Sequence, residues 1–163
     1  MQPKDKLRAI AAQQAGFFTA AQASEAGYPD SLHIYHTREG HWQKVQRGIY
    51  RFTDSPPADW PELVIWSLWS RDRNGNPQIV YSHETAEQIH GLRPRTADKL
   101  HVTVPRTFRK NCALPSELIF HKNDLPQDQI EQRPGYRVIA LAAAPRSAPV
   151  AVNYDHIINI GED

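Results

Sequence analysis

Cysteine is nearly absent from this sequence of 163 residues, which contains only Cys112. A single thiol excludes both an internal disulfide framework and a zinc site built from cysteines. Long apolar runs are also missing, and the N-terminal stretch 1–14 is polar, without the apolar core of a secretory signal. These absences predict a cytoplasmic protein with no membrane partner.

Motifs of catalysis are equally scarce. The sequence has no Gly-rich phosphate loop and no nucleophile elbow. His83 and His90 share one predicted helix, but the zinc-protease pattern requires histidines at positions i and i+4, which these two do not occupy. Glu117 and Lys122 have the wrong spacing for a magnesium-dependent nuclease, which is kept as a minor alternative. We therefore expect no enzymatic activity, no cofactor and no metal ion.

Acidic residues are unevenly distributed in a chain whose net charge is only +1. Residues 31–51 contain four bases and the single acid Glu39, and residues 93–122 contain seven bases against Asp98 and Glu117. Local positive surfaces on a near-neutral protein favour contact with polyanions. Solvated faces that balance at random are the alternative interpretation.

Residues 1–54 predict helices followed by a hairpin. A first helix is expected over 3–14, and Thr19 is placed to cap a second helix that ends at Gly27. A third helix follows, and two short strand-like pieces then meet at a turn around Arg47–Gly48. This order is the layout of a winged helix-turn-helix domain.

The third predicted helix, from about Pro29 to Gly40, separates into two faces on a helical wheel. Leu32, Tyr35 and His36 fall on one side, which leaves the other side exposed. The exposed side is polar and carries no acid. Its members are Ser31, His33, Ile34, Thr37 and Arg38. Such a face suits the major groove of DNA, although winged helices also serve as protein docking modules.

The rest of the chain predicts a second, smaller module. Residues 55–76 read as a connection that contains a helix apolar on nearly every side, used as a strut between the halves or as an interface. Residues 77–145 alternate short strands with one helix capped by Ser82, as in a small α+β domain. Residues 146–163 form a tail of unknown role. The fold class expected for the whole chain is α+β.

The predicted DNA contacts lie on the second and third helices and on the hairpin. They are Thr19, Ser31, His33, Ile34, Thr37, Arg38, Lys44, Gln46 and Arg47. Thr19 would reach phosphate through its hydroxyl and the helix N-terminus, and Lys44 to Arg47 would rest on the backbone or minor groove. A second basic patch would meet phosphate or an acidic protein. It consists of Arg93, Arg95, Lys99, Arg106, Arg109 and Lys110.

Three stretches of the sequence resemble the type IV abortive-infection antitoxin family, the AbiEi-like transcriptional regulators. Arg47 to Arg51 match that family's hairpin motif, and "SHETAEQIHGL" from Ser82 matches its Ser-His-Glu-Thr/Ser-Ala helix. The strand "HVTVP" from His101 matches the third motif. Together the matches cover roughly residues 10 to 125.

The resemblance implies an N-terminal domain that binds double-stranded DNA and represses its own operon at inverted repeats. It also implies a nucleotidyltransferase-like toxin encoded nearby. We therefore predict a sequence-specific transcriptional regulator, acting as a homodimer because one such domain buries too little surface for strong specificity. The alternative is a protein-interaction module that counteracts the toxin without relying on DNA binding.

Overall fold

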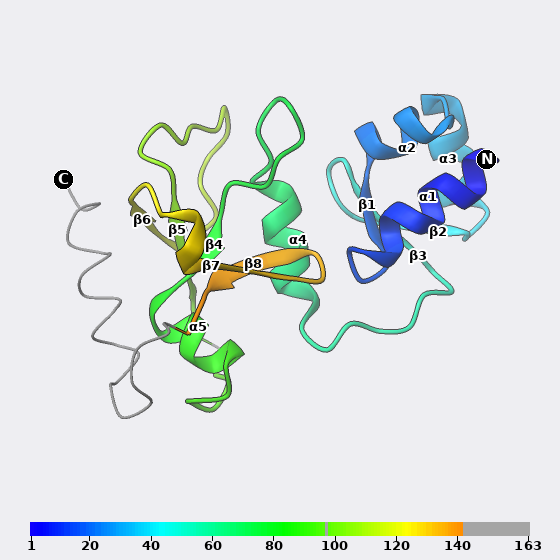
Figure 1. Cartoon of the computed structure of the whole chain (residues 1–163). Coiled ribbons are helices and arrows are strands. Elements are labelled where there is room, and N and C mark those ends of the chain that lie inside the picture. The colour runs from blue at the N-terminus through cyan, green and yellow to red at the C-terminus, as the bar shows by residue number, and fades with distance from the viewer. Residues whose placement is uncertain (97, 142–163) are drawn as a thin grey trace. The chain divides into compact units, whose positions relative to one another are not determined.

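The computed structural model describes residues 1–96 and 98–141, which form helices and two β-sheets (Figure 1). The predicted α+β class is confirmed. The predicted tail, 146–163, lies outside the described residues. None of the helices in the described part of the chain has both the length and the apolar character needed to cross a membrane.

The described residues group into two compact units. The first consists of residues 1–77 together with 134–136, and the second of residues 78–133 together with 137–141. The helix from the predicted connection therefore groups with the first unit. The domain boundaries predicted at residues 54 and 76 stay predictions.

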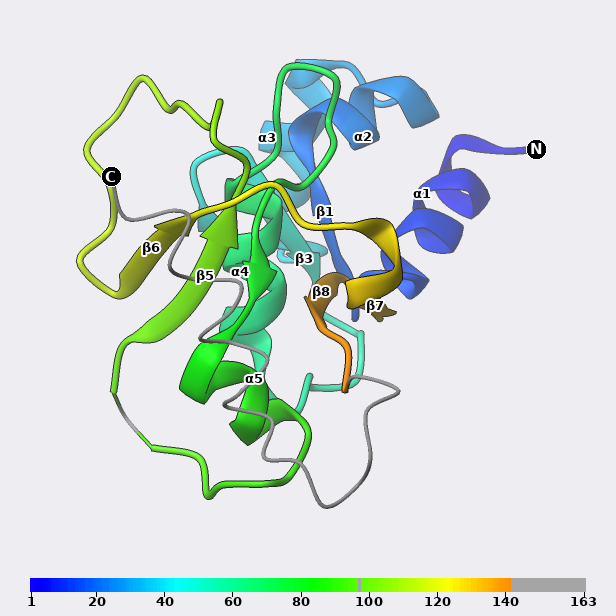
Figure 2. The same ribbon diagram turned by 60° about the vertical axis from the view of Figure 1, so that its left-hand side comes forward.

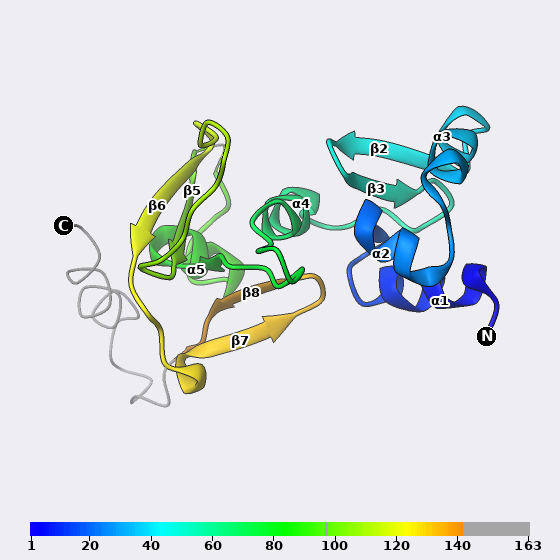
Figure 3. The same ribbon diagram turned by 90° about the horizontal axis from the view of Figure 1, so that it is seen from above.

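The first unit has a winged helix-turn-helix order, as predicted. Its elements are α1 (Pro3–Ala12), β1 (Phe17–Thr19), α2 (Ala20–Ala26), α3 (Asp30–Arg38), β2 (Trp42–Gln46), β3 (Ile49–Phe52) and α4 (Pro61–Trp69). The sheet order is β1-β3-β2 with antiparallel pairing, so Phe18 lies opposite Tyr50. Strand β1 was not predicted, because three residues between two helices carry no readable alternation. Figure 3 shows the β2–β3 hairpin with α3 at its end.

Two turns of the first unit depend on glycine. Gly27 ends α2 with a φ of 118°, in the left-handed region, and Gly48 turns the hairpin with a φ of 75°. Residues with a Cβ are strained in this region. A Cβ on Gly48 would also lie 3.0 Å from the Arg71 guanidinium. The turns predicted at these two glycines are confirmed.

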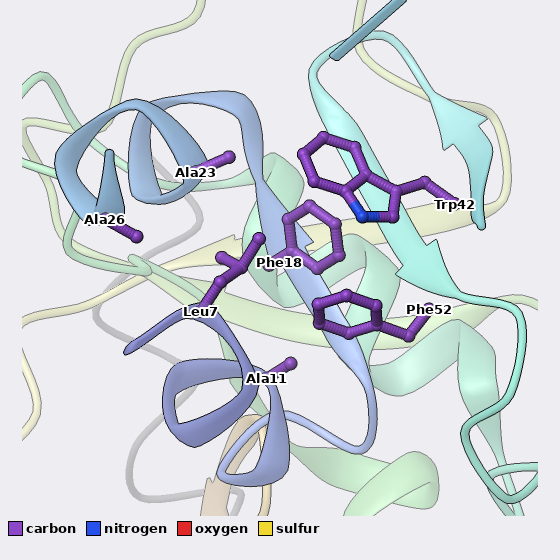
Figure 4. Packing of buried hydrophobic residues seen from close by; sticks show 7 residues of the cluster. All are labelled: Leu7, Ala11, Phe18, Ala23, Ala26, Trp42 and Phe52. Carbon is purple, nitrogen blue, oxygen red and sulfur yellow. The ribbon is translucent and has the colours of Figure 1, made fainter. Parts of the chain in front are cut away.

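The core beneath the three N-terminal helices is aromatic. Figure 4 shows Phe18 at its centre, with Trp42 and Phe52 on one side and helix residues Leu7 and Ala11 on the other. The Phe18 ring centroid lies 4.8 Å from the ring centroids of both Trp42 and Phe52. Edge-on and tilted aromatic contacts of this kind add to the free energy gained by burial. The hairpin and α1 are therefore held to one shared core.

Helix α4 packs within the first unit on a second apolar cluster. Leu63, Val64 and Leu68 are at most 3% exposed, and Val64 and Leu68 meet Phe17 and Ile49 of β1 and β3. The rings of its two tryptophans meet edge to face, with centroids 5.9 Å apart. This packing explains why α4 is apolar on most of its faces.

The second unit is built on a mixed sheet. Its elements are β4 (Val80–Tyr81), α5 (His83–Ile89), β5 (Leu100–Val104), β6 (Leu118–Lys122), a short 3-10 helix η1 (Gln127–Gln129), β7 (Ile130–Arg133) and β8 (Tyr136–Ile139). The strand order is β6-β5-β4-β8-β7, with β5 antiparallel to β4 and parallel to β6. Helix α5 packs against β5 (Figure 2). Strand β7 was not predicted, since its sequence is almost entirely polar.

Candidate nucleic-acid interface

Histidine 33 fixes the orientation of α3. Its side chain is 4% exposed, and its Nε2 lies 2.7 Å from the carbonyl oxygen of Tyr28 in the helix–helix turn. The ring packs on Trp42 at a centroid distance of 5.5 Å. The prediction that His33 faces solvent is wrong. The prediction placed His33 outside because histidine is polar, but the Tyr28 carbonyl oxygen and the Trp42 ring hold it in the interior.

The face that α3 exposes is consequently rotated from the predicted one. Leu32 and Tyr35, expected to be buried, are 38% and 48% exposed. Ile34 is 60% exposed, and Ser31 and Arg38 also face solvent, as predicted. The exposed face combines a hydroxyl, a guanidinium and three apolar side chains. The exposure of Leu32 and Tyr35 was not predicted, and only the hydrogen-bond partner of His33 could have revealed it.

The C-terminal half of α3 rests on the hairpin through aromatic contacts. The ring of His36 stacks on Trp42 with centroids 5.0 Å apart, and its Nδ1 lies 2.9 Å from Nδ1 of His41. Burial lowers the pKa of His36, and the nearby His41 and His33 lower it further. The Thr37 hydroxyl donates to the carbonyl of His33 at 2.7 Å. Thr37, a predicted contact, is thus half-buried and bonded within its own helix.

Thr19 is occupied by its own helix. Its side chain is 2% exposed and accepts a hydrogen bond from the backbone N–H of Gln22 at 3.1 Å. The Gln22 amide oxygen in turn accepts from the Thr19 backbone N–H at 2.9 Å, which completes a capping box. The predicted capping role is confirmed. The predicted phosphate contact through the hydroxyl is wrong, because that oxygen is buried and already bonded.

The β2–β3 hairpin carries the remaining predicted contacts. Lys44 and Arg47 are exposed and Gln46 is half-buried, with an irregularity in the strand register between Lys44 and Gln46. A bulge of this kind bends a strand and re-aims its side chains. Within residues 1–96 and 98–141, neither Lys44 nor Arg47 has an acidic partner. Their charges therefore remain available on the hairpin.

Two other bases of the first unit have structural roles. The Arg8 guanidinium pairs with the Asp54 carboxylate at 2.7 Å and covers the Phe52 ring at 4.0 Å. Its hydrogen bond raises the pKa of Arg8 and lowers the pKa of Asp54. Arg51 donates to the carbonyl oxygens of Phe52 and Pro56 at 3.1 and 3.0 Å. Arg38 and the hairpin residues Lys44 and Arg47, in contrast, are exposed.

The second basic patch divides into two groups at opposite ends of β5. Arg93, Arg95 and Lys99 precede the strand, and the group from Arg106 to Lys110 follows it. Arg93 is already paired with Glu87 at 2.9 Å. That these bases act together stays a prediction.

Comparison with protein families gives a match in the N-terminal part of the chain. Residues 5–53 match a family model described as a transcriptional regulator, AbiEi antitoxin. The match covers the three helices and the hairpin and agrees with the predicted resemblance over that segment. A search of curated proteins found no match.

Proposed function

We propose that this chain, which carries an AbiEi-type antitoxin regulator segment at residues 5–53, is a sequence-specific DNA-binding transcriptional regulator. The observation that carries the proposal is the exposed face of α3 in a helix-turn-helix, next in the chain to a hairpin bearing Lys44 and Arg47. A short turn containing Gly27 joins α2 to α3, as in DNA-binding helix pairs.

Four exposed side chains of α3 have a contact to offer in the major groove. Arg38 can donate in a bidentate way to guanine, and the Ser31 hydroxyl can donate or accept. Ile34 and Leu32 suit the methyl group of thymine. Lys44 and Arg47 would neutralise phosphates, which positions the helix without reading sequence. One unit of this size offers a small footprint, so we propose a homodimer on an inverted repeat.

Titration of a labelled DNA fragment from upstream of the gene tests the proposal. We expect Arg38→Ala with Arg47→Ala to weaken binding at least about tenfold at moderate salt, and wild-type affinity to fall steeply as salt rises. Arg73→Ala is the matched control, because Arg73 is an exposed base of the same unit outside α3 and the hairpin. Equal affinity of the double variant and wild type would refute the proposal.

Autorepression is tested separately in cells. A reporter driven by the upstream region should be repressed by the wild-type chain and by Arg73→Ala, and derepressed with the double variant. If reporter expression is the same with all three proteins, autorepression is refuted and the proposal is limited to DNA binding at sites other than the upstream region.

A second candidate function rests on the apolar side chains of α3. Leu32, Ile34 and Tyr35 are all more than a third exposed, a composition that also suits a protein partner. In that case the chain would neutralise a toxin encoded beside its gene. Co-expression with that toxin discriminates between the two. Growth rescue by the Arg38/Arg47 double variant, combined with loss of rescue in Ile34→Asp, would favour the protein-binding function.

A further inference from the structure

Three histidines that are distant in the sequence meet in the second unit. His83 begins α5, His101 lies on β5 and His121 lies on β6. In the parallel β5–β6 pair, His101 lies opposite Ile119 and His121 opposite Thr103. Residues two apart on a strand point to the same face, so His101 and His121 share one face of the sheet. Helix α5 packs on β5 and brings His83 to this face.

The three rings pack directly on one another. The ring centroids of His83 and His121 are 3.8 Å apart, and their ring planes are nearly parallel. The ring centroids of His101 and His121 are 5.4 Å apart. Nδ1 of His101 lies 3.1 Å from Nε2 of His121. One nitrogen from each ring can be chosen so that all three lie within 4.8 Å of one another.

Burial disfavours the protonated form of two of these imidazoles. It lowers the pKa of His101, and it lowers the pKa of His83 to about 3, with His121 and His101 adding to the effect. A neutral imidazole has a nitrogen lone pair to donate to a metal ion. A ring cluster held only by packing would be equally neutral, so the geometry has to be tested with an ion.

The surrounding hydrogen bonds hold the cluster in place. The backbone N–H of His101 donates to the Thr85 hydroxyl at 2.8 Å, and the Thr103 hydroxyl donates to Ser82 at 2.8 Å. These bonds tie the start of α5 to β5 on both sides of His83. His83 itself has a φ of 57°, in the left-handed region that costs a β-carbon residue free energy.

We propose that His83, His101 and His121 form a binding site for a divalent transition-metal ion of the zinc class. Imidazole nitrogens suit zinc, copper, nickel and iron, and three of them leave a position for water or another donor. Tetrahedral zinc with bonds of about 2.0–2.1 Å needs nitrogens about 3.3 Å apart. Side-chain rotations that turn these nearly parallel rings toward one point would bring the three nitrogens to that spacing and replace the histidine–histidine hydrogen bond with metal bonds.

The proposed site departs from the sequence-based expectation that the protein binds no metal ion. It also differs from the pair of histidines considered in the sequence, His83 and His90. His90, the other histidine of that pair, lies at the far end of α5, where its Nε2 meets the carbonyl of Ile139 at 2.8 Å. The bound ion would link α5, β5 and β6, and so stabilise the second unit. This inference does not depend on DNA binding by the first unit.

The site is tested by titrating Zn²⁺ into the untagged full-length protein and measuring the heat of binding by calorimetry. The protein is first treated with a chelator and dialysed. We expect a single saturable Zn²⁺ site and a higher melting temperature with Zn²⁺. His83→Gln and His121→Gln should each weaken affinity about tenfold or more. His41→Gln is the matched control, since it removes an exposed histidine that pairs with His36 in the other unit. It should leave affinity unchanged.

Two results would overturn the proposal. One is the absence of saturable Zn²⁺ binding by the wild type, and the other is equal weakening by His41→Gln and His121→Gln. If a variant of His83 or His121 fails to fold, the NMR signals of the histidine rings in the wild type test the site instead. Zn²⁺ should shift the rings of His83, His101 and His121 first, and shifts confined to other histidines would refute the site.

Discussion

The two units of this protein use their buried and half-buried histidines in opposite ways. In the first unit, His33 points its ring nitrogen at a backbone carbonyl and lays its ring on Trp42. In the second unit, His83, His101 and His121 lie against one another. A ring bonded to the backbone fixes the direction of a helix, whereas rings that face each other gather donor atoms at one point. The surroundings of a histidine, more than its burial, therefore indicate its role.

Removing the aromatic centre of the first unit should have the largest effect. Phe18 is fully buried between Trp42 and Phe52, so Phe18→Ala leaves a cavity and should lower the free energy of unfolding by about 3–5 kcal/mol. All four tryptophans lie in the first unit, so urea unfolding followed by tryptophan fluorescence reports on it. Phe18→Leu is the control, with a smaller loss. A loss below about 1 kcal/mol for Phe18→Ala would contradict the assigned core.

An intermediate effect is expected at His33. His33→Ala removes the hydrogen bond to Tyr28 and the contact with Trp42, and should cost about 1–3 kcal/mol in the same assay. His41→Ala, at an exposed position, should change stability by no more than about 0.5 kcal/mol. Similar losses in both variants would mean that His33 does not anchor α3.

The smallest effect is expected from pH, and it belongs to the second unit. The folded pKa of His83 is lowered to about 3 from 6.5, so between these values the unfolded chain binds more protons than the folded one. The free energy of unfolding should therefore fall as pH is lowered from about 6.5 toward 3, with a modest size because the ring is partly exposed.

Far-UV circular dichroism during urea unfolding at pH 7 and pH 5, with chelator present, measures this dependence. His83→Gln should show a weaker pH dependence than wild type. An unchanged dependence would assign the effect to other groups, such as His36, whose pKa is also lowered.

Much of the fold could be predicted from local signals. Thr19 and Gly27 mark the ends of α2, and the turn at Gly48 separates two short β segments, so helices and hairpin follow from short-range chemistry. The family match over residues 5–53 agrees with that pattern. The three-residue β1 and the polar β7 were missed, because neither has an apolar alternation.

The candidate sites were less predictable, since they depend on contacts between distant residues. The helical-wheel prediction for α3 rested on the assumption that the more apolar side is buried. His33 is buried instead, because it contacts the Tyr28 carbonyl and the Trp42 ring. The histidine cluster required the register of β5 against β6, which places His101 and His121 on one face. Strand alternation indicates the face of each histidine separately and gives no register between strands.

In α3, the side chain that packs into the core is not one of those that project into solvent. His33 fastens the helix to the core, while Ser31, Ile34, Tyr35 and Arg38 project from it. A combinatorial library restricted to these four projecting positions would leave the anchor intact. The surface of α3 can thus be varied at these positions without redesigning the interior of the N-terminal unit.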